Sequence, residues 1–290
     1  MRTFDLAEPK SLQEACAILA SDLDAKPIAG GTALLTLIKQ GILLPKTVVN
    51  LKKITGDNEI IYDAVSGLRI GALATINEIE TAPLIRQHYP ALAEACHVVA
   101  NIRIRNMATI GGNLAHADYQ SDPPTVLIAL DGDVELMNSR ATRKVKLADF
   151  LLGSYETALE PGELVSALLV PPMPNGMTGS YVKFTTGSSG ERPCAGVAAL
   201  TRMDNGICRE LRLAVGAVSP RPVRVTAGEE MASDMILTDQ LIEYIAAEAA
   251  RSIDPFDDVR GPVDYKRQLV GVLVRRAIAA LANGKAERNR

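Results

Sequence analysis

The amino-acid sequence predicts an α+β protein, and its 290 residues are enough for more than one domain. Three observations predict this class. Two glycine pairs stand in short stretches of small residues: Gly30-Gly31 leads from an apolar segment into a helix-like run, and Gly111-Gly112 lies between two apolar runs. A proline-rich stretch at residues 171–176 has the composition of a linker. Beyond this stretch, strand-like segments come first and amphipathic helices follow, an order typical of α+β domains.

Residues 1–53 are predicted as a first subdomain of alternating helices and strands. Ser11 and Glu14 have the spacing of a capping box, so a helix is expected to begin there. The pattern that follows indicates two strands with a short helix between them. These three elements are predicted at residues 26–29, 32–40 and 47–51.

Residues 54–175 are predicted as a second subdomain with more strands and stronger helices. Thr75 and Glu78 repeat the capping-box spacing, and residues 90–100 follow as a long helix. Asp122 stands before two prolines and is expected to cap the next helix with its carboxylate. Two β-hairpins are also predicted, from residues 59–62 with 68–72 and from residues 133–137 with 142–147.

Residues 176–290 are predicted as a C-terminal α+β domain. Its first part contains three apolar segments separated by short polar turns, which indicates an antiparallel sheet. Its second part contains two amphipathic helices. The strands are expected at residues 179–185, 195–203 and 208–218, and the helices at residues 238–251 and 262–282.

Composition and charge argue against several classes of partner and location. The formal charge of −3 arises from 31 basic and 34 acidic residues without a long basic run. We therefore expect neither nucleic acid nor an anionic membrane surface as the main partner. No apolar run approaches the ~18 residues of a transmembrane helix, and the first residues do not resemble a signal segment. A cytoplasmic location is the corresponding expectation.

Metal ligands and catalytic side chains are not indicated either. The four cysteines and three histidines lack the spacing of a metal site. We find neither the G-x-G-x-x-G nor the G-x-x-x-x-G-K-[ST] nucleotide pattern, and no serine or cysteine in a G-x-S-x-G setting. We therefore expect no catalytic residue and no metal ligand in this chain.

The two glycine pairs are the best candidates for chemistry. Glycine allows backbone angles that other residues resist and lets a ligand approach the main chain. Backbone N–H groups beside a helix start are a common phosphate site. Around the second pair, Thr109, Asn113, His116 and Asp118 add polar groups within ten residues. Either pair by itself is also what a tight turn needs, but the two together favour a ligand with more than one phosphate.

The same two loops carry a resemblance to a known family. The segments are Ala29-Gly30-Gly31-Thr32 and Thr109-Ile110-Gly111-Gly112-Asn113, the latter followed by Ala117 and Asp118. They resemble the flavin-binding subunits of the molybdenum hydroxylases, the family of carbon monoxide dehydrogenase and xanthine dehydrogenase. The resemblance extends over nearly the whole chain, including the predicted C-terminal helix.

This resemblance implies a fold and a cofactor. The fold would be the two-subdomain FAD-binding fold of the vanillyl-alcohol oxidase class, followed by a C-terminal antiparallel sheet with packed helices. FAD would be the cofactor of this chain, because the flavin itself supplies the redox chemistry and the protein need only bind and orient it. The implied cofactor-binding residues are Ala29, Gly30, Gly31, Thr32, Ala33, Leu34, Thr109, Ile110, Gly112, Asn113, Ala117, Asp118 and Lys183.

Two of these residues have alternative interpretations. Lys183 belongs to a Tyr-x-Lys segment, Tyr181 to Lys183, and the family's lysine there lies near the flavin, but the residue could also be a solvated charge at a strand edge. Asp118 could be a ligand of the ribityl chain or the ring, or it could cap a helix. His116 is expected near the site without direct contact.

The resemblance also implies partner subunits. These would be a small subunit with two [2Fe–2S] clusters and a large subunit with a molybdopterin cofactor, in a dimer of heterotrimers. Electrons would pass from molybdenum through the clusters to FAD and on to an external acceptor. A stand-alone FAD oxidase of the same fold and a non-enzymatic scaffold module are the alternatives.

Overall fold

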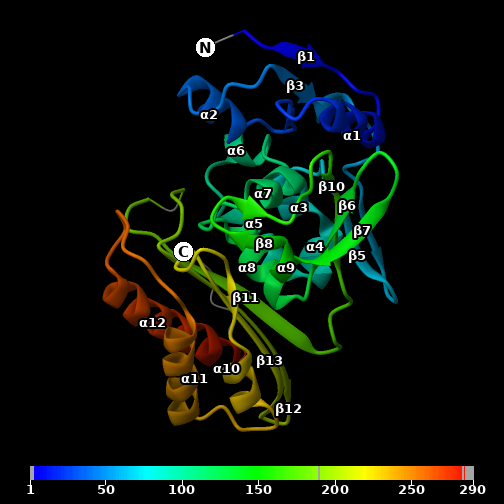
Figure 1. Cartoon of the computed structure of the whole chain (residues 1–290). Coiled ribbons are helices and arrows are strands. Elements are labelled where there is room, and N and C mark those ends of the chain that lie inside the picture. Colours follow the sequence, from blue (N-terminus) through cyan, green and yellow to red (C-terminus); the bar gives the residue numbers. More distant parts are fainter. Residues whose placement is uncertain (1–2, 189, 283, 285–290) are drawn as a thin grey trace.

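The computed structural model describes residues 3–188, 190–282 and 284. These residues form a three-stranded, a five-stranded and a four-stranded sheet, with one additional two-stranded sheet. Figure 1 shows the three larger sheets following one another along the molecule, from the N-terminal one at the top to the C-terminal one at the bottom. The end of the predicted C-terminal domain, residues 285–290, lies outside the described residues.

The N-terminal sheet has the strand order β1-β3-β2, and both strand pairs are parallel. The helix predicted from Ser11 is confirmed, since the Ser11 hydroxyl accepts a hydrogen bond from the N–H of Glu14 at 3.1 Å. The second helix begins two residues later than predicted because the backbone of Gly31 is left-handed. The elements are β1 (Asp5–Ala7), α1 (Leu12–Ser21), β2 (Lys26–Ile28), α2 (Leu34–Lys39), β3 (Thr47–Asn50) and the short 3-10 helix η1 (Leu51–Lys53).

The central sheet has the order β4-β5-β10-β6-β7 and is antiparallel throughout. Both predicted hairpins are confirmed, and β10 joins them by pairing with β5 and β6. The strands are β4 (Ile60–Asp63), β5 (Gly67–Gly71), β6 (Asp133–Met137), β7 (Thr142–Lys146) and β10 (Leu164–Val170), with β8 (Leu151–Gly153) and β9 (Glu156–Thr157) forming the two-stranded sheet.

Most helices of the central part lie between β5 and β6 in the sequence. The capping box is present at the first of them, where Thr75 and Glu78 bind each other's backbone N–H groups. The helix predicted over residues 90–100 ends at His97, because Val98 leaves the helical path and Ala100 is left-handed. The helices are α3 (Ile76–Thr81), α4 (Pro83–His88), α5 (Pro90–His97), α6 (Ile102–Arg105), α7 (Ile110–His116), α8 (Asp122–Ala129) and α9 (Leu147–Phe150).

The C-terminal sheet has the antiparallel order β11-β12-β13-β14, which confirms the predicted three strands and adds a short fourth. Helix α12 packs on β12 and also against α11. Figure 1 shows these helices on one side of the sheet. The elements are β11 (Met177–Phe184), β12 (Ala195–Asp204), β13 (Ile207–Gly216), β14 (Val223–Arg224), α10 (Thr226–Ala232), α11 (Asp239–Ser252) and α12 (Val263–Ala282).

Strand β12 is buried on both faces of this sheet. Val197 and Ala199 belong to the core beneath α11 and α12, whereas Ala198 and Leu200 belong to the core of the central part. Successive residues of a strand point to opposite faces, and residues 195–200 of this strand, which are buried on both sides, are accordingly all apolar or glycine. Helices α5 and α8 form the cover on the second side, against β11 and β12 respectively. The central and C-terminal parts are therefore joined through a shared apolar core.

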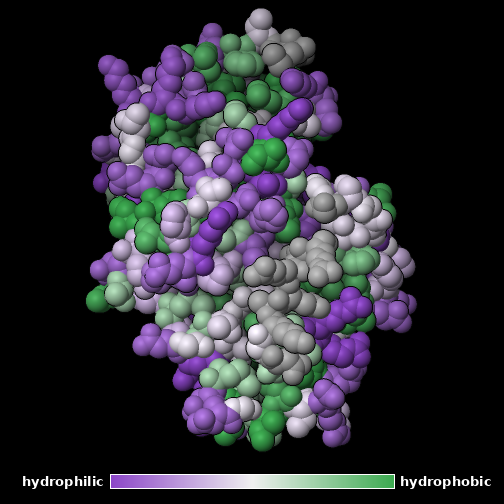
Figure 2. All heavy atoms as spheres, turned by 180° about the vertical axis from the view of Figure 1, so that it is seen from behind, coloured by the Kyte–Doolittle hydropathy of each residue, from purple (hydrophilic) through white to green (hydrophobic). Residues whose placement is uncertain are grey.

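The surface is mixed in character. Figure 2 shows the face behind that of Figure 1, where hydrophobic side chains form separate groups among hydrophilic ones. Exposed large hydrophobic residues come from all parts of the chain, for example Ile42, Val65 and Val259. Among the described residues, no helix combines the length and the hydropathy needed to cross a membrane.

Candidate cofactor site

The two glycine loops lie directly against each other. A Cβ atom added to Gly30 would be 1.9 Å from the carbonyl oxygen of Met107 and 2.9 Å from the Cα atom of Ala108. Both are backbone atoms, so no side-chain rotation could relieve the overlap. The missing side chain of Gly30 therefore allows the loop after β2 to contact the segment that leads into α7.

Gly31 turns the chain from β2 toward α2. Its φ of +71° is in the left-handed region, which costs other L-residues about 1–2 kcal/mol. The N–H of Leu35 donates to the Gly31 carbonyl at 3.1 Å and starts the helix. Within the described residues, the N–H groups of Gly31, Thr32 and Ala33 donate to no backbone acceptor. Three adjacent donors thus remain for a ligand, as a phosphate site requires.

The second glycine pair has a different role. We expected it to need unusual backbone angles, and this is wrong, because Gly111 and Gly112 lie in the first turn of α7 and neither has a positive φ. A Cβ atom on Gly111 would be 2.6 Å from the Cβ atom of Ala72. One on Gly112 would meet only the Thr109 Oγ1 atom, at 2.9 Å. Gly111 therefore permits close packing of α7, and Gly112 leaves space open.

The first turn of α7 is bonded to the protein itself. The N–H of Ile110 donates to Ala74 and that of Gly111 donates to Ala72, both at 2.9 Å. The Thr109 hydroxyl accepts from the N–H of Gly112 at 3.2 Å and caps the helix. These donors are occupied, so α7 contributes a rigid wall and its polar side chains rather than free N–H groups.

Both loops line one cavity of about 300 Å³, which is at the small end of the ~300–1,000 Å³ typical of ligand sites. Glu163 also lines it, but its carboxylate accepts two hydrogen bonds from Arg143, at 2.8 and 2.7 Å, so its charge is compensated. Nine of the thirteen predicted residues line the cavity: Ala29, Gly30, Gly31, Thr32, Ala33, Leu34, Thr109, Gly112 and Asn113. Lining residues that the sequence did not single out as ligands include Ala108, Gly111, Leu164 and Val165.

Ile110, Ala117, Asp118 and Lys183 do not line this cavity. Ile110 is buried in the core beneath α7, and Ala117 ends the helix with a left-handed φ of +48°. The Asp118 carboxylate pairs with Arg192 at 2.8 Å and accepts from the N–H of Gln120 at 3.1 Å. It therefore stabilises a turn and does not cap a helix.

Lys183 is buried, contrary to the alternative of a solvated strand edge, with 4% of its side chain exposed. Its Nζ atom lies 3.1 Å from Oδ2 of Asp122 and donates to the Val98 carbonyl at 2.8 Å. The Tyr181 hydroxyl donates to the other oxygen of Asp122 at 2.8 Å. A role of Lys183 toward FAD remains a prediction.

The expected capping role of Asp122 is therefore wrong. Ser121 is the N-cap residue of α8, and no side chain caps this helix. Asp122 instead links α8 to β11 through Lys183 and Tyr181. Burial raises the pKa of Asp122 to about 6, although Lys183 acts to lower it. This network connects the central part of the chain to the C-terminal sheet.

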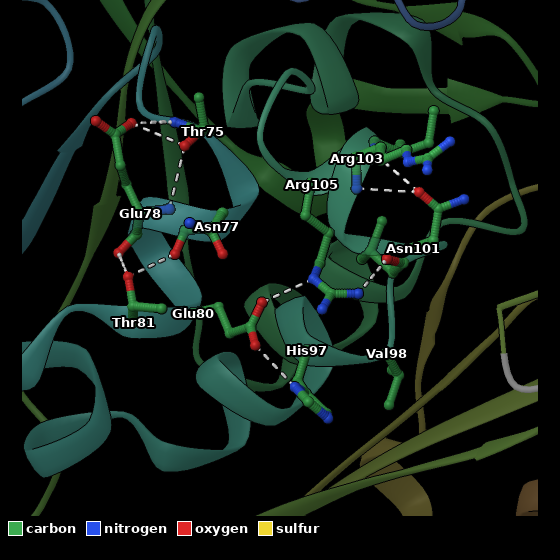
Figure 3. Close-up of polar contacts among 12 residues, drawn as sticks. Thr75, Asn77, Glu78, Glu80, Thr81, His97, Val98, Asn101, Arg103 and Arg105 are labelled. Atoms are coloured by element: carbon green, nitrogen blue, oxygen red, sulfur yellow. Dashed lines mark hydrogen bonds and ion pairs between the residues drawn. The ribbon is translucent and has the colours of Figure 1, made fainter.

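A second polar network joins α3, α5 and α6, and Figure 3 shows it. Glu80 binds Arg105 at 2.7 Å and His97 at 2.8 Å. Both Glu80 and Arg105 have side chains only 11% exposed. Arg105 ends α6, directly before the Met107 segment that contacts Gly30. Sequence reasoning missed Glu80, because it is 25 residues from Arg105 and no local pattern joins them.

The cavity fits a cofactor that carries a diphosphate. Free backbone donors stand at residues 31–33, and the glycine positions leave room that a Cβ atom would fill. No lysine or arginine lines the cavity, so these backbone donors are the charge-compensating groups that the loops offer. The described part of the chain contains no cluster of three or more potential metal ligands. Fold and site together define a protein that binds an extended, phosphate-bearing cofactor.

Comparison with known proteins identifies this class further. Residues 2–173 match the family model described as the FAD binding domain in molybdopterin dehydrogenase, and residues 181–281 match the C-terminal domain of CO dehydrogenase flavoprotein. The medium subunit of nicotine 6-hydroxylase from Paenarthrobacter nicotinovorans is 32% identical over 272 residues, covering 94% of this chain and 95% of that one. The medium chain of glyceraldehyde dehydrogenase from Sulfolobus acidocaldarius is 31% identical over 281 residues, covering 96% and 98%.

A solved structure agrees with these relatives. Carbon monoxide dehydrogenase from Hydrogenophaga pseudoflava contains a chain that superposes with a TM-score of 0.93 at 31% identity, over 99% of both chains. The protein therefore belongs to the family of FAD-binding flavoprotein subunits of molybdopterin dehydrogenases. It is an oxidoreductase subunit with FAD as its cofactor, and the predicted fold is confirmed. The relatives are subunits of larger enzymes, which favours this function over a stand-alone oxidase.

Proposed function

We propose that this chain carries electrons through FAD within a cytoplasmic molybdenum hydroxylase of three kinds of subunit. A small subunit with two [2Fe–2S] clusters would deliver electrons from a large molybdopterin subunit, and an external acceptor would remove them. Two such heterotrimers would form the complete enzyme. The observation that carries the proposal is the meeting of both glycine loops at one cavity, in a chain of this family.

The chain's own residues would bind and orient the cofactor. The N–H groups of residues 31–33 donate to the diphosphate, and the side chains of Thr109 and Asn113 add polar contacts. Asn113 is held in place by Ser121, whose hydroxyl donates to its side-chain oxygen at 2.8 Å. Leu34 packs beside the phosphate loop. When bound, FAD supplies the ability to accept and release electrons singly or in pairs.

The remaining predicted ligands belong to the same proposal. Ala117 and Asp118 would contact the ribityl chain or the ring, with Lys183 close to the flavin. We also propose that the chain divides at residues 53 and 175, into subdomains 1–53 and 54–175 and a C-terminal domain 176–290. The three larger sheets support this division, although apolar side chains such as Leu164 and Tyr181 belong to cores that extend across it.

The substrate would be selected outside this chain. Nicotine 6-hydroxylase and glyceraldehyde dehydrogenase have very different substrates by name, and both contain a medium subunit that matches nearly all of this chain. Among the described residues, the titratable side chains that line the cavity are His116 and Glu163, and the charge of Glu163 is compensated by Arg143. A carrier that is independent of the substrate accounts for both facts.

The test is turnover with and without partners. The purified full-length chain, free of molybdenum and iron, should contain flavin and show no turnover of aldehydes, N-heterocycles or carbon monoxide. Co-expression with the two neighbouring subunit genes should restore activity with one substrate class. Turnover at an enzymatic rate by the chain alone would overturn the proposal in favour of a stand-alone oxidase.

A further inference from the structure

A second cavity lies in the central part of the chain, outside the cofactor site. Its volume is about 570 Å³, within the ~300–1,000 Å³ typical of small-molecule sites. Its lining comes from α3, α4, α5 and the residue that follows α5, and none of the lining residues belongs to the cofactor cavity. The cavity is therefore a separate place for a ligand to bind.

Glu80 holds two polar side chains at this cavity. Arg86 Nε donates to the Glu80 carbonyl oxygen at 2.8 Å, and His97 Nδ1 lies 2.8 Å from Glu80 Oε1. All three residues line the cavity, and Figure 3 shows the His97 ring directed toward Glu80. Because Arg86 and His97 are bound to the same residue, their remaining polar atoms are close enough together for one small molecule to contact both.

Glu80 also decides which nitrogen of His97 carries the proton. Arg105 Nε donates to the second carboxylate oxygen of Glu80 at 2.7 Å, and both side chains of this pair are only 11% exposed. A carboxylate paired in this way is ionised and accepts hydrogen bonds only. His97 Nδ1 must therefore donate, and in the neutral imidazole Nε2 is left as an acceptor. Within the described residues, this Nε2 atom has no partner.

Arg86 offers groups of the opposite kind. It is exposed, and in the described part of the chain its two terminal nitrogens have no hydrogen-bond or ion-pair partner. A guanidinium binds a carboxylate through two parallel N–H bonds. The acids of the cavity do not compete for Arg86, because both oxygens of Glu80 are occupied and Glu94 accepts from the N–H of Tyr181 at 3.1 Å.

We propose that this cavity binds a small hydroxycarboxylate with a short apolar body. The carboxylate binds the terminal nitrogens of Arg86, and the hydroxyl donates to Nε2 of His97. The apolar body packs on the remaining wall, which Pro90, Ala93 and Val98 provide. An ammonium group in place of the hydroxyl would lie beside the positive charge of Arg86, which favours the hydroxyl. The inference goes beyond the proposed function, since it involves no residue of the cofactor cavity.

The test is titration of the full-length chain at pH 8, where imidazole side chains are ordinarily neutral. Mandelate is the probe, and calorimetry measures its binding. Mandelate should bind saturably with a Kd of about 1 mM or tighter, as expected for a ligand of this size. Phenylacetate lacks only the hydroxyl and should bind about two- to tenfold more weakly, because one neutral hydrogen bond is lost. Phenylglycine, which has an ammonium group instead of the hydroxyl, should also bind more weakly than mandelate.

Two variants assign the two polar contacts. Arg86→Gln should weaken the binding of mandelate and of phenylacetate by at least about tenfold, because the contact to a charged group is lost. His97→Ala should leave the binding of phenylacetate unchanged and remove the preference for mandelate. Arg103→Gln is the matched control, because Arg103 is exposed on α6, which contributes nothing to the cavity. This variant has the same net charge as Arg86→Gln and should bind mandelate as the wild type does.

The measurements on the wild type do not depend on whether a variant folds. Absence of saturable mandelate binding by the wild-type chain would overturn the inference, as would equal affinities for mandelate and phenylacetate. Tighter binding of phenylglycine than of mandelate would also contradict it. Arg86 and His97 are exposed, so both variants should keep the thermal midpoint of the wild type, and a folded Arg86→Gln chain with unchanged affinity would refute the proposed contact. A wild-type chain that bound mandelate but no FAD would refute the proposed function only.

Discussion

Replacing Gly30 with alanine tests the contact between the two glycine loops most directly. The added Cβ atom would lie 1.9 Å from the Met107 oxygen, and real Cβ contacts essentially never fall below 3.0 Å. The loops must therefore separate by at least about 1.1 Å at this point. Arg105, two residues before Met107, is fixed by its largely buried ion pair with Glu80, so we expect the loop after β2 to move.

The expected loss follows from hydrogen-bond geometry. A typical N–H···O bond of ~2.9 Å that is lengthened by such a shift is broken. Hydrogen bonds to charged groups contribute about 1.5–3 kcal/mol each, so the loss of one phosphate contact weakens FAD binding about 10- to 150-fold. Overpacking should also lower the free energy of unfolding by about 1–3 kcal/mol.

The assay is titration of the flavin-free chain with FAD, together with urea unfolding. Gly271→Ala is the matched control, because its Cβ atom would meet only the Ala246 oxygen at 3.8 Å, in the interior of α12. That variant should bind FAD normally and gain up to about 1 kcal/mol of stability from helix propensity. A Gly30→Ala chain whose Kd for FAD stays within twofold of the wild type would refute the proposed contact geometry.

Three further predictions concern the cofactor and the domain connection. Gly112→Val should abolish FAD binding and leave the fold largely intact, because the added Cβ atom meets only Thr109 Oγ1 and the valine methyl groups would enter the cavity. Circular dichroism tests the fold and flavin absorbance tests the binding, and a normal flavin content in the folded variant would contradict this prediction. FAD should be bound non-covalently, so acid precipitation should release yellow flavin, whereas colour in the pellet would contradict this. Asp122 has a folded-state pKa of about 6 against an ordinary 3.8, so its protonated form stabilises the fold at low pH and this contribution is lost as the pH rises through 6. Compared with Asp122→Asn, the wild type should therefore lose up to about 3 kcal/mol of its free energy of unfolding between pH 4 and pH 7. Urea unfolding at several pH values tests this, and an equal change with pH in both proteins would contradict it.

Local patterns predicted the elements well where the determining interactions are local. Ser11 and Thr75 cap helices as their spacing to a following glutamate indicated, because a capping box involves only neighbouring residues. The hairpins were recognised for the same reason. Asp122 shows the limit of this approach, since its carboxylate binds Lys183, 61 residues away, in preference to its own helix.

The sequence alone determined the fold class, the family and nine of the residues that line the cavity, because glycine and hydroxyl residues stand in a fixed local order in its two loops. Only the tertiary structure decided how the two glycine pairs differ. Gly30 is needed for the contact between the loops, Gly31 for its left-handed backbone, and Gly111 for packing on Ala72. It also decided that Lys183 is buried and that Tyr155 stands beside His116. Such contacts join residues far apart in the chain, and their geometry depends on how whole sheets and helices pack, which no local pattern encodes.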